Sequence, residues 1–233
     1  MKVLAADTST NIISIAVTEN SKTKAMMHEQ FNKSCGTSLV PNIDKLLKEA
    51  GFGIQDIDLL CIGTGPGSFT GLRASVATMR SMSIALNKPL IGIPSFDVIA
   101  HGIIQTPNSK LQTHNSICIM SDARQNKIYA RFYKYDNGRL EPQSDFLLDS
   151  IENVANNIDC STIIAGDAIT KYKEQIQKQK KDLVFLTPEE LWYPRADILA
   201  ELGFVKNEQG YKDDPFTLLP LYIYPKECQI RKV

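Results

Sequence analysis

The sequence predicts an α/β fold that is built twice, as two lobes of one 233-residue chain. Three observations carry this prediction. Short apolar strands alternate with amphipathic helices along the chain, which is typical of sheets covered by helices. A strand, an acidic turn and a second strand open the chain, and the same order begins again after residue 115. A polar segment at residues 105–115 lies between the two repeats and is the predicted linker.

Residues 1–104 form the predicted first lobe. Ile13, Ile15 and Val17 alternate with small residues, which is the period of a half-buried strand. Gly51 follows a helical pattern and is the predicted helix stop. The predicted elements are, in order, strands at 3–6, 12–17 and 24–29, a helix at 37–50, a strand at 57–62, a helix at 68–86, a strand at 90–93 and a helix at 96–103.

Residues 105–215 form the predicted second lobe, and residues 216–233 a C-terminal tail that packs back on the first lobe. The second lobe repeats the strand, acidic turn and strand of the first, and then adds further strands and helices. Its predicted elements are strands at 117–120, 128–133 and 163–165 and helices at 170–181 and 195–202.

The composition is that of a globular protein without net charge. Lys+Arg and Asp+Glu both number 26, whereas a protein that grips RNA by itself usually carries a basic excess. The basic cluster at residues 178–181 is interpreted as the solvated face of a helix. Five widely spaced cysteines show no zinc-ligand spacing and indicate reduced thiols. No apolar run approaches about 20 residues and no signal peptide is recognised, so a cytoplasmic protein without membrane contact is predicted.

The densest local signal is the loop at residues 63–73, Gly-Thr-Gly-Pro-Gly-Ser-Phe-Thr-Gly-Leu-Arg. Its glycines and its proline predict a tight turn from a strand into a helix. Two interpretations stay open: a cradle for an anion at the helix N-terminus, or a loop kept tight for packing. The spacing is neither that of a P-loop nor that of a dinucleotide-binding fingerprint.

This loop, with Asp7-Thr8-Ser9 before it and Ile93-Pro94-Ser95 after it, resembles the bacterial TsaB (YeaZ) family. Asp122-Ala123-Arg124 and Pro220-Leu221-Tyr222-Ile223 are similar to the second-lobe opening and the tail of that family. The resemblance implies an actin-like (ASKHA, ribonuclease H-like) two-lobe fold. It also implies a role in making threonylcarbamoyladenosine in tRNAs that read ANN codons.

The resemblance further implies partners. In that family the chain pairs with a larger paralogue, TsaD, which binds the metal and performs the transfer, and a small ATPase, TsaE, joins the pair. The chain is therefore expected to be a non-catalytic subunit, to form a homodimer when alone, and to meet tRNA only through the complex.

The titratable residues agree with a subunit that carries neither catalytic residues nor a metal site. His28, His101 and His114 are too far apart in sequence to form a helical ligand pair. The turn at Asp7, Thr8 and Ser9 offers a carboxylate and hydroxyls, but it contains no glycine to let the backbone approach a phosphate. No cofactor is expected to be required, and weak ATP or ADP binding at these three residues stays open. The alternative function is a stand-alone actin-fold ATPase or small-molecule kinase.

The helix at 68–86 predicts a partner surface. It carries only two charged residues and is apolar or small nearly all round, so it should be buried on both sides. The helix at 37–50 is expected beside it, and two such helices could pack on two from another chain. The alternative, that the second lobe or the tail covers this face, stays open. The predicted contact residues are Leu39, Ile43, Leu47, Phe69, Leu72, Arg73, Val76, Met79 and Arg80.

Overall fold

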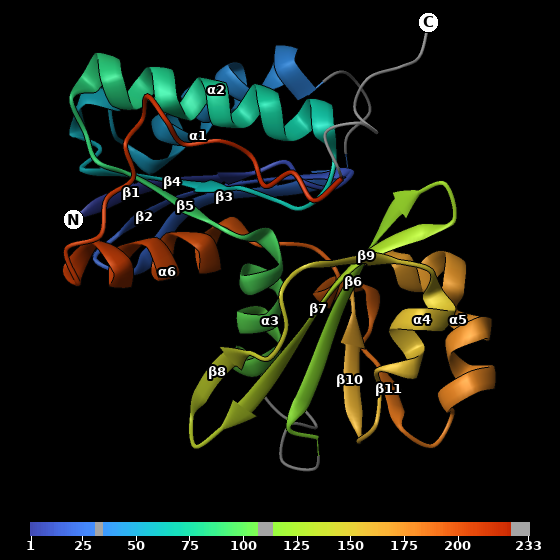
Figure 1. Cartoon of the computed structure of the whole chain (residues 1–233). Helices are drawn as coiled ribbons and strands as arrows, with labels where there is room; N and C mark the ends of the chain where they lie inside the picture. The colour runs from blue at the N-terminus through green and yellow to red at the C-terminus, as the bar shows by residue number, and fades with distance from the viewer. Residues whose placement is uncertain (31–34, 107–113, 225–233) are drawn as a thin grey trace, which may run out of the picture. The chain divides into compact units, whose positions relative to one another are not determined.

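The computed structural model describes residues 1–30, 35–106 and 114–224 (Figure 1). The chain divides into two compact units. Unit 1 contains Met1–Val98 and Pro194–Leu221, and unit 2 contains the described residues from Ile99 to Tyr193 and from Tyr222 to Tyr224. Each unit is built around one β-sheet.

Unit 1 has a five-stranded sheet with the order β3-β2-β1-β4-β5. The first three strands form an antiparallel meander, and β4 and β5 continue the sheet in parallel with β1. In register, Ala5 of β1 lies between Ala16 of β2 and Cys61 of β4. The strands are β1 (Lys2–Asp7), β2 (Ile12–Glu19), β3 (Lys22–Gln30), β4 (Leu59–Gly63) and β5 (Leu90–Ile93).

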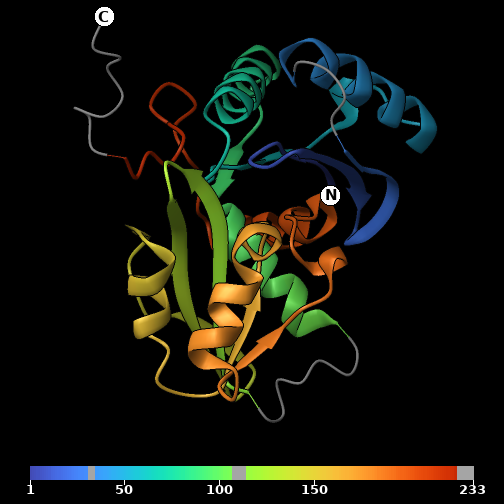
Figure 2. The same ribbon diagram turned by 90° about the vertical axis from the view of Figure 1, so that its right-hand side faces the viewer.

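Helices cover both faces of this sheet. Figures 1 and 2 show α1 (Cys35–Ala50) and α2 (Phe69–Leu86) on one face and α6 (Ala196–Glu208) on the other. Leu4 packs in the core cluster under α1 and α2, while its neighbour Val3 packs in the cluster under α6. Successive side chains of a strand point to opposite faces, so a strand covered on both sides is apolar at every position. A 3-10 turn at Ile54–Asp56 precedes β4.

Unit 2 has a six-stranded sheet in which β11-β10-β6-β7-β8 form the path and β9 pairs with β7. Helices α4 and α5 pack on one of its faces. The strands are β6 (Ser116–Arg124), β7 (Lys127–Asp136), β8 (Arg139–Pro142), β9 (Leu147–Asp149), β10 (Thr162–Ala165) and β11 (Val184–Leu186). The helical elements are α3 (Ser95–Gln105), which belongs to unit 2 from Ile99 onward, α4 (Ile151–Asn156), α5 (Ala168–Lys180) and a 3-10 turn at Glu189–Leu191.

The two sheets repeat one topology. Order β8-β7-β6-β10-β11 of unit 2 corresponds strand by strand to order β3-β2-β1-β4-β5 of unit 1. In both, an antiparallel meander is followed by two parallel strands that each come after a helix. This repeat confirms the predicted duplicated, actin-like α/β fold.

Helix α6 lies in unit 1, although the sequence analysis assigned it to a second lobe at residues 105–215. Its small apolar face, including Ala196 and Ala200, is buried against the outer side of β1 and β4. A Cβ atom on Gly203 would lie 2.1 Å from Cys61 Sγ, so the helix approaches the sheet very closely. The sequence shows that this face is apolar but does not show which sheet it covers.

The segment after α6, which includes residues 216–221 of the predicted tail, also lies in unit 1. Asp213 forms an antiparallel bridge with Leu90, and its carboxylate accepts a hydrogen bond from Gly92 N at 2.8 Å. Leu218 packs against the core cluster under α1 and α2. The segment therefore covers the edge strand β5, whose backbone groups would otherwise be open to pairing with another chain. Residues 225–233 lie outside the described residues.

Candidate functional site

The glycine-rich loop between β4 and α2 is tied to two other segments of unit 1. Gly65 N donates to Ser95 Oγ at 3.1 Å, and Ser95 N donates back to Gly65 O at 2.8 Å. Ser68 N donates to Ser9 O at 2.6 Å. Ser68 is the N-cap of α2, where its Oγ accepts from Gly71 N at 3.3 Å. These hydrogen bonds connect the loop that follows β4 to the turn of the first hairpin and to the start of α3. We call this set of bonded segments the closed joint.

Asp7 lies at the centre of this joint and is fully buried. Its Oδ1 accepts a hydrogen bond from Ser9 N at 2.8 Å, and its Oδ2 accepts one from Ser95 Oγ at 2.6 Å. Burial raises the pKa of the Asp7 carboxyl above its ordinary value of 3.8, and the hydrogen bonds from Ser95 and Ser9 oppose that rise. The carboxylate thus holds two segments that are far apart in sequence.

Thr8 and Ser9 are also buried, each 2% exposed. Thr8 Oγ1 lies 3.0 Å from Gly71 O and 2.8 Å from Ser75 Oγ, so it binds the first turns of α2. Ser9 Oγ has no hydrogen-bond partner within the part of the chain that the structure describes. None of the three predicted nucleotide-binding residues presents an accessible side chain. Two of them are bonded directly to the glycine-rich loop, Thr8 through its hydroxyl and Ser9 through its carbonyl oxygen.

Two glycines of the loop are required by contact with this hairpin turn. A Cβ atom on Gly67 would lie 2.0 Å from Ser9 O, and one on Gly71 would lie 2.3 Å from Thr8 O. Real Cβ atoms do not approach a carbonyl oxygen so closely. Of the two interpretations of the loop, the geometry therefore favours tight packing over an open anion cradle.

We predict that Asp7→Ala destabilises the fold, because Ser9 N–H and the Ser95 hydroxyl would lose their acceptor in a buried site. The expected loss is about 3 kcal/mol in the free energy of unfolding, measured by urea denaturation. Asp7→Asn keeps one acceptor oxygen and is the control, with an expected loss of less than half as much. An unchanged midpoint for Asp7→Ala would contradict the structural role.

Helix α2 packs its larger apolar residues on its own sheet, which corrects part of the predicted contact set. Leu72, Val76 and Met79 are at most 2% exposed, and Val76 and Met79 belong to the core cluster with β1, β2 and β4. These three residues cannot contact a partner while the unit is folded. The predicted contact set therefore took these three residues from the side of the helix that packs on its own sheet.

The same correction applies to α1. The same core cluster, between the helices and the sheet of unit 1, buries three residues of α1: Leu39, Ile43 and Leu47. Only three of the nine predicted contact residues, all on α2, reach the surface: Phe69, Arg73 and Arg80. Arg73 lies over the Phe69 ring at 4.0 Å, and Arg80 donates hydrogen bonds to the carbonyl oxygens of Pro215 and Phe216.

The outward face of α2 is nevertheless nearly uncharged. Ala77, Ser81 and Ala85 are exposed along it, and Ile84 is 45% exposed. Val40 of α1 is 49% exposed on the same helical layer. The outward surface of α2 is therefore made mostly of small and apolar residues with Arg73 and Arg80, whereas α1 beside it also exposes the ion pairs Lys45–Glu49 and Lys48–Asp44.

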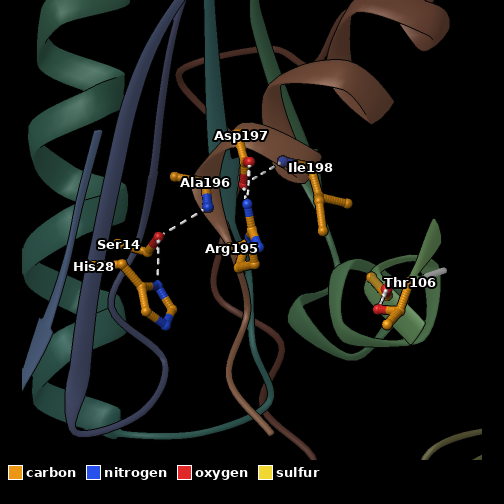
Figure 3. Close-up of polar contacts among 8 residues, drawn as sticks. Ser14, His28, Thr106, Arg195, Ala196, Asp197 and Ile198 are labelled. Carbon is orange, nitrogen blue, oxygen red and sulfur yellow. Dashed lines mark hydrogen bonds and ion pairs between the residues drawn. The ribbon is translucent and has the colours of Figure 1, made fainter. Parts of the chain in front are cut away.

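The three histidines do not form a ligand set. His28 Nδ1 lies 3.1 Å from Ser14 Oγ, which also accepts a hydrogen bond from Ala196 N at 2.8 Å (Figure 3). Beside them, Arg195 forms an ion pair with Asp197, in which Arg195 Nη2 lies 2.6 Å from Asp197 Oδ2. Across residues 1–30, 35–106 and 114–224 no cluster of three or more His, Cys, Asp or Glu side chains could hold a metal ion. His28 takes part in fixing the start of α6 to the sheet.

We predict that His28 makes the fold less stable in acid. Burial, followed by the Arg195 charge, lowers the pKa of His28 below its ordinary 6.5, while Asp197 opposes this shift. The unfolded chain then binds more protons than the folded chain below about pH 6.5, so stability falls as the pH drops through that value. Denaturation midpoints at about pH 7.5 and pH 5.5 should differ less for His28→Gln than for the natural chain. An equal difference for both would contradict this role.

Comparison with known proteins identifies the family. A family model described as TsaD, tRNA N6-adenosine threonylcarbamoyltransferase, matches residues 13–226. The chain belongs to this family. It is 25% identical over 234 residues to the tRNA threonylcarbamoyladenosine biosynthesis protein TsaB of Bacillus subtilis, covering 99% of this chain and 97% of that protein. TsaB of Haemophilus influenzae is 23% identical over 232 residues, with 96% and 93% covered.

Solved structures agree on the fold. YeaZ from Pseudomonas aeruginosa superposes with a TM-score of 0.81 at 24% identity and covers 95% of this chain and 99% of that one. Together these matches confirm the resemblance to the TsaB (YeaZ) family that the loop at residues 63–73 predicts. No helix in the described residues of this TsaB-family chain is long and apolar enough to span a membrane.

Sequence reasoning missed three important residues of this TsaB-family chain. Ser95 was noted only as part of a motif, because its partner Asp7 lies 88 residues away and no local pattern connects them. Ala77 and Ile84 were not assigned to the outward surface. For Ala77 a signal was present: the largest apolar side chains of a helix usually pack on its own core, which leaves small residues outside.

Proposed function

We propose that the chain is a non-catalytic partner subunit in the biosynthesis of threonylcarbamoyladenosine in tRNA. It would bind a TsaD-type paralogue and support transfer of threonylcarbamoyl to adenosine of tRNAs that read ANN codons. A TsaE-type ATPase would join the pair, and the chain alone would form a homodimer. Membership of the TsaD family and similarity to proteins named TsaB support the pathway.

The observation that carries the partner role is the surface of the α1–α2 layer. Five of the exposed large hydrophobic side chains lie on this layer or on the tail segment bound to it by Arg80: Val40, Phe69, Ile84, Phe216 and Leu219. Exposed apolar side chains and arginine are features of protein interfaces, and the charged residues that α1 also exposes would belong to the polar rim. The small residues of α2 would let another helix approach closely.

The non-catalytic part of the proposal is supported by how unit 1 uses its polar turn. In an open site, the carboxylate of Asp7 and the hydroxyl of Thr8 could bind phosphate or metal. Here they are buried and bonded to Ser95, Ser9 and the first turns of α2. Weak ATP or ADP binding at this turn would require the glycine-rich loop to move away.

Reconstitution tests the proposal. The chain, the TsaD-type and TsaE-type proteins of the same organism, tRNA, ATP, threonine and a source of the threonylcarbamoyl donor are combined, and modified nucleoside is measured. We expect modification only when the chain is present, and none from the chain with tRNA alone. Modification at full rate without the chain would reject the partner role. Micromolar ATP affinity of the isolated chain, measured by calorimetry and lost in Asp7→Asn, would favour the ATPase or kinase alternative.

A further inference from the structure

Helix α5 concentrates positive charge in a chain whose formal net charge is zero. Residues 168–181 contain five lysines and one glutamate. The helix lies on one face of the unit 2 sheet, next to α4 (Figure 2). Its charge therefore forms a local basic surface that the average composition hides.

The lysines occupy the outward side of α5. Its buried residues, Ala168, Ile169, Tyr172 and Ile176, form one apolar stripe against the sheet. Two lysines are held by their own unit: Lys180 Nζ donates to Ile158 O at 2.9 Å, and Lys171 Nζ lies 3.6 Å from Asp122 Oδ1.

The other three lysines of this surface point to a ligand from outside. Lys173, Lys178 and Lys181 are exposed, and none of them forms an ion pair with any residue that the structure describes. At 1.5 Å rise per residue, the stretch from Lys171 to Lys181 is about 15 Å long. Since an α-helix turns by about 100° per residue, Lys173 and Lys178 lie on the two sides of the outward face with Lys181 between them, and ammonium groups spread in this way can meet more than one phosphate of a strand.

The chemistry of this surface favours a polyanion over a protein. Between the lysines the outward positions are Thr170, Gln175, Gln177 and Gln179, with Glu174 as the acid among them and exposed Asp182 directly after Lys181, and no exposed apolar side chain is present among these described positions. Protein interfaces are enriched in aromatic residues and arginine and depleted in lysine. Lysine binds phosphate as a point charge, and contacts with phosphates carry no sequence information by themselves.

We propose that α5 binds the sugar–phosphate backbone of the tRNA in the complex, without recognising bases. This inference rests on the proposed function, because that function brings the RNA to the chain. The neutral net charge means that the isolated chain binds RNA only weakly at physiological salt. The basic surface acts once the partner has brought the RNA close.

The test compares complexes of the TsaD-type partner with the natural chain and with Lys173→Gln, Lys178→Gln, Lys181→Gln combined. Affinity for a tRNA transcript is measured at a series of salt concentrations. We expect the slope of log affinity against log salt to become shallower by about 2 to 3, and the affinity at the lowest salt to fall at least about tenfold. A chain with Lys22→Gln, Lys134→Gln and Lys206→Gln loses the same charge elsewhere and should keep the natural slope.

The outcomes separate this inference from the proposed function. If the natural chain fails to co-elute with the partner, the proposed function is rejected and the inference falls with it. If the complex forms but the α5 variant keeps the natural RNA affinity and slope, only the inference is rejected. If the folded α5 variant no longer joins the partner, α5 binds an acidic protein surface, which also rejects RNA binding. Glutamine is a good helix former, so circular dichroism should show an intact variant.

Discussion

Replacing Ala77 by glutamate is expected to weaken association with the TsaD-type partner by about 100-fold or more, which is about 2.7 kcal/mol of binding free energy. Ala77 is exposed in the middle of the outward face of α2. A carboxylate placed there must lose its water when another helix packs on the face, and the two nearest basic residues are already engaged, Arg73 over the Phe69 ring and Arg80 with two carbonyl oxygens of the tail segment. The isolated chain should fold normally, because glutamate is a good helix former at an exposed position. Titration of the partner with the variant measures the effect.

Two comparison variants make this result specific. Gln177→Glu adds the same charge to an exposed position of α5 and should leave association with the TsaD-type partner unchanged. Val76→Glu places the charge in the core of unit 1, where Val76 is 2% exposed. It should lower the free energy of unfolding by more than about 4 kcal/mol. If Ala77→Glu binds the partner as tightly as the natural chain, the outward face of α2 is not the interface.

The second large effect is expected at the glycine-rich loop. Gly71→Ala should lower the free energy of unfolding by about 3 kcal/mol. In an exposed helix the same substitution would stabilise by about 1 kcal/mol, so the sign of the effect is diagnostic. The Cβ atom of the alanine would lie 2.3 Å from Thr8 O. That oxygen cannot move away easily, because the Thr8 hydroxyl is bonded to Ser75 and the next residue, Ser9, donates its N–H to the Asp7 carboxylate.

Gly53→Ala is the matched control for this measurement. Gly53 has a φ of −90°, and the nearest atom to a Cβ there is Asp56 Oδ2 at 3.5 Å, which is an ordinary contact. Its urea midpoint should stay within about 0.5 kcal/mol of the natural chain. A Gly71→Ala chain as stable as Gly53→Ala would show that the hairpin turn can move away from α2, and the closed joint would then be wrong.

The error in the predicted contact set has a physical cause. The pattern of α2 correctly shows a helix that is uncharged nearly all round, since Arg73 and Arg80 are its only charges. Such a helix has two sides that can be buried, and its sequence does not say which side meets its own sheet. The structure places Val76 and Met79 in the core, because large apolar side chains gain most from contact with β1 and β4. The small residues remain for the outward side.

The sequence by itself determined the longer elements and their order, but it did not show β8, β9, α4 and β11 of unit 2, which are only 3 to 6 residues long. Periodicity and glycine or proline punctuation are local properties, so strands such as Ile12–Glu19 and helices such as Phe69–Leu86 are visible without any tertiary information. Because the order strand, acidic turn and strand occurs twice, the sequence also predicts that the fold is duplicated, as the two sheets confirm. The glycine-rich loop determined the family.

Only the tertiary structure decided three matters that depend on contacts between distant residues. It placed α6 on the sheet of unit 1, it buried Asp7 against Ser95, and it selected the outward face of α2. Each of these choices depends on which surfaces fit together across the folded chain. A local pattern can show that a residue is apolar or polar, but the partner that buries it is set by packing of segments far apart in sequence.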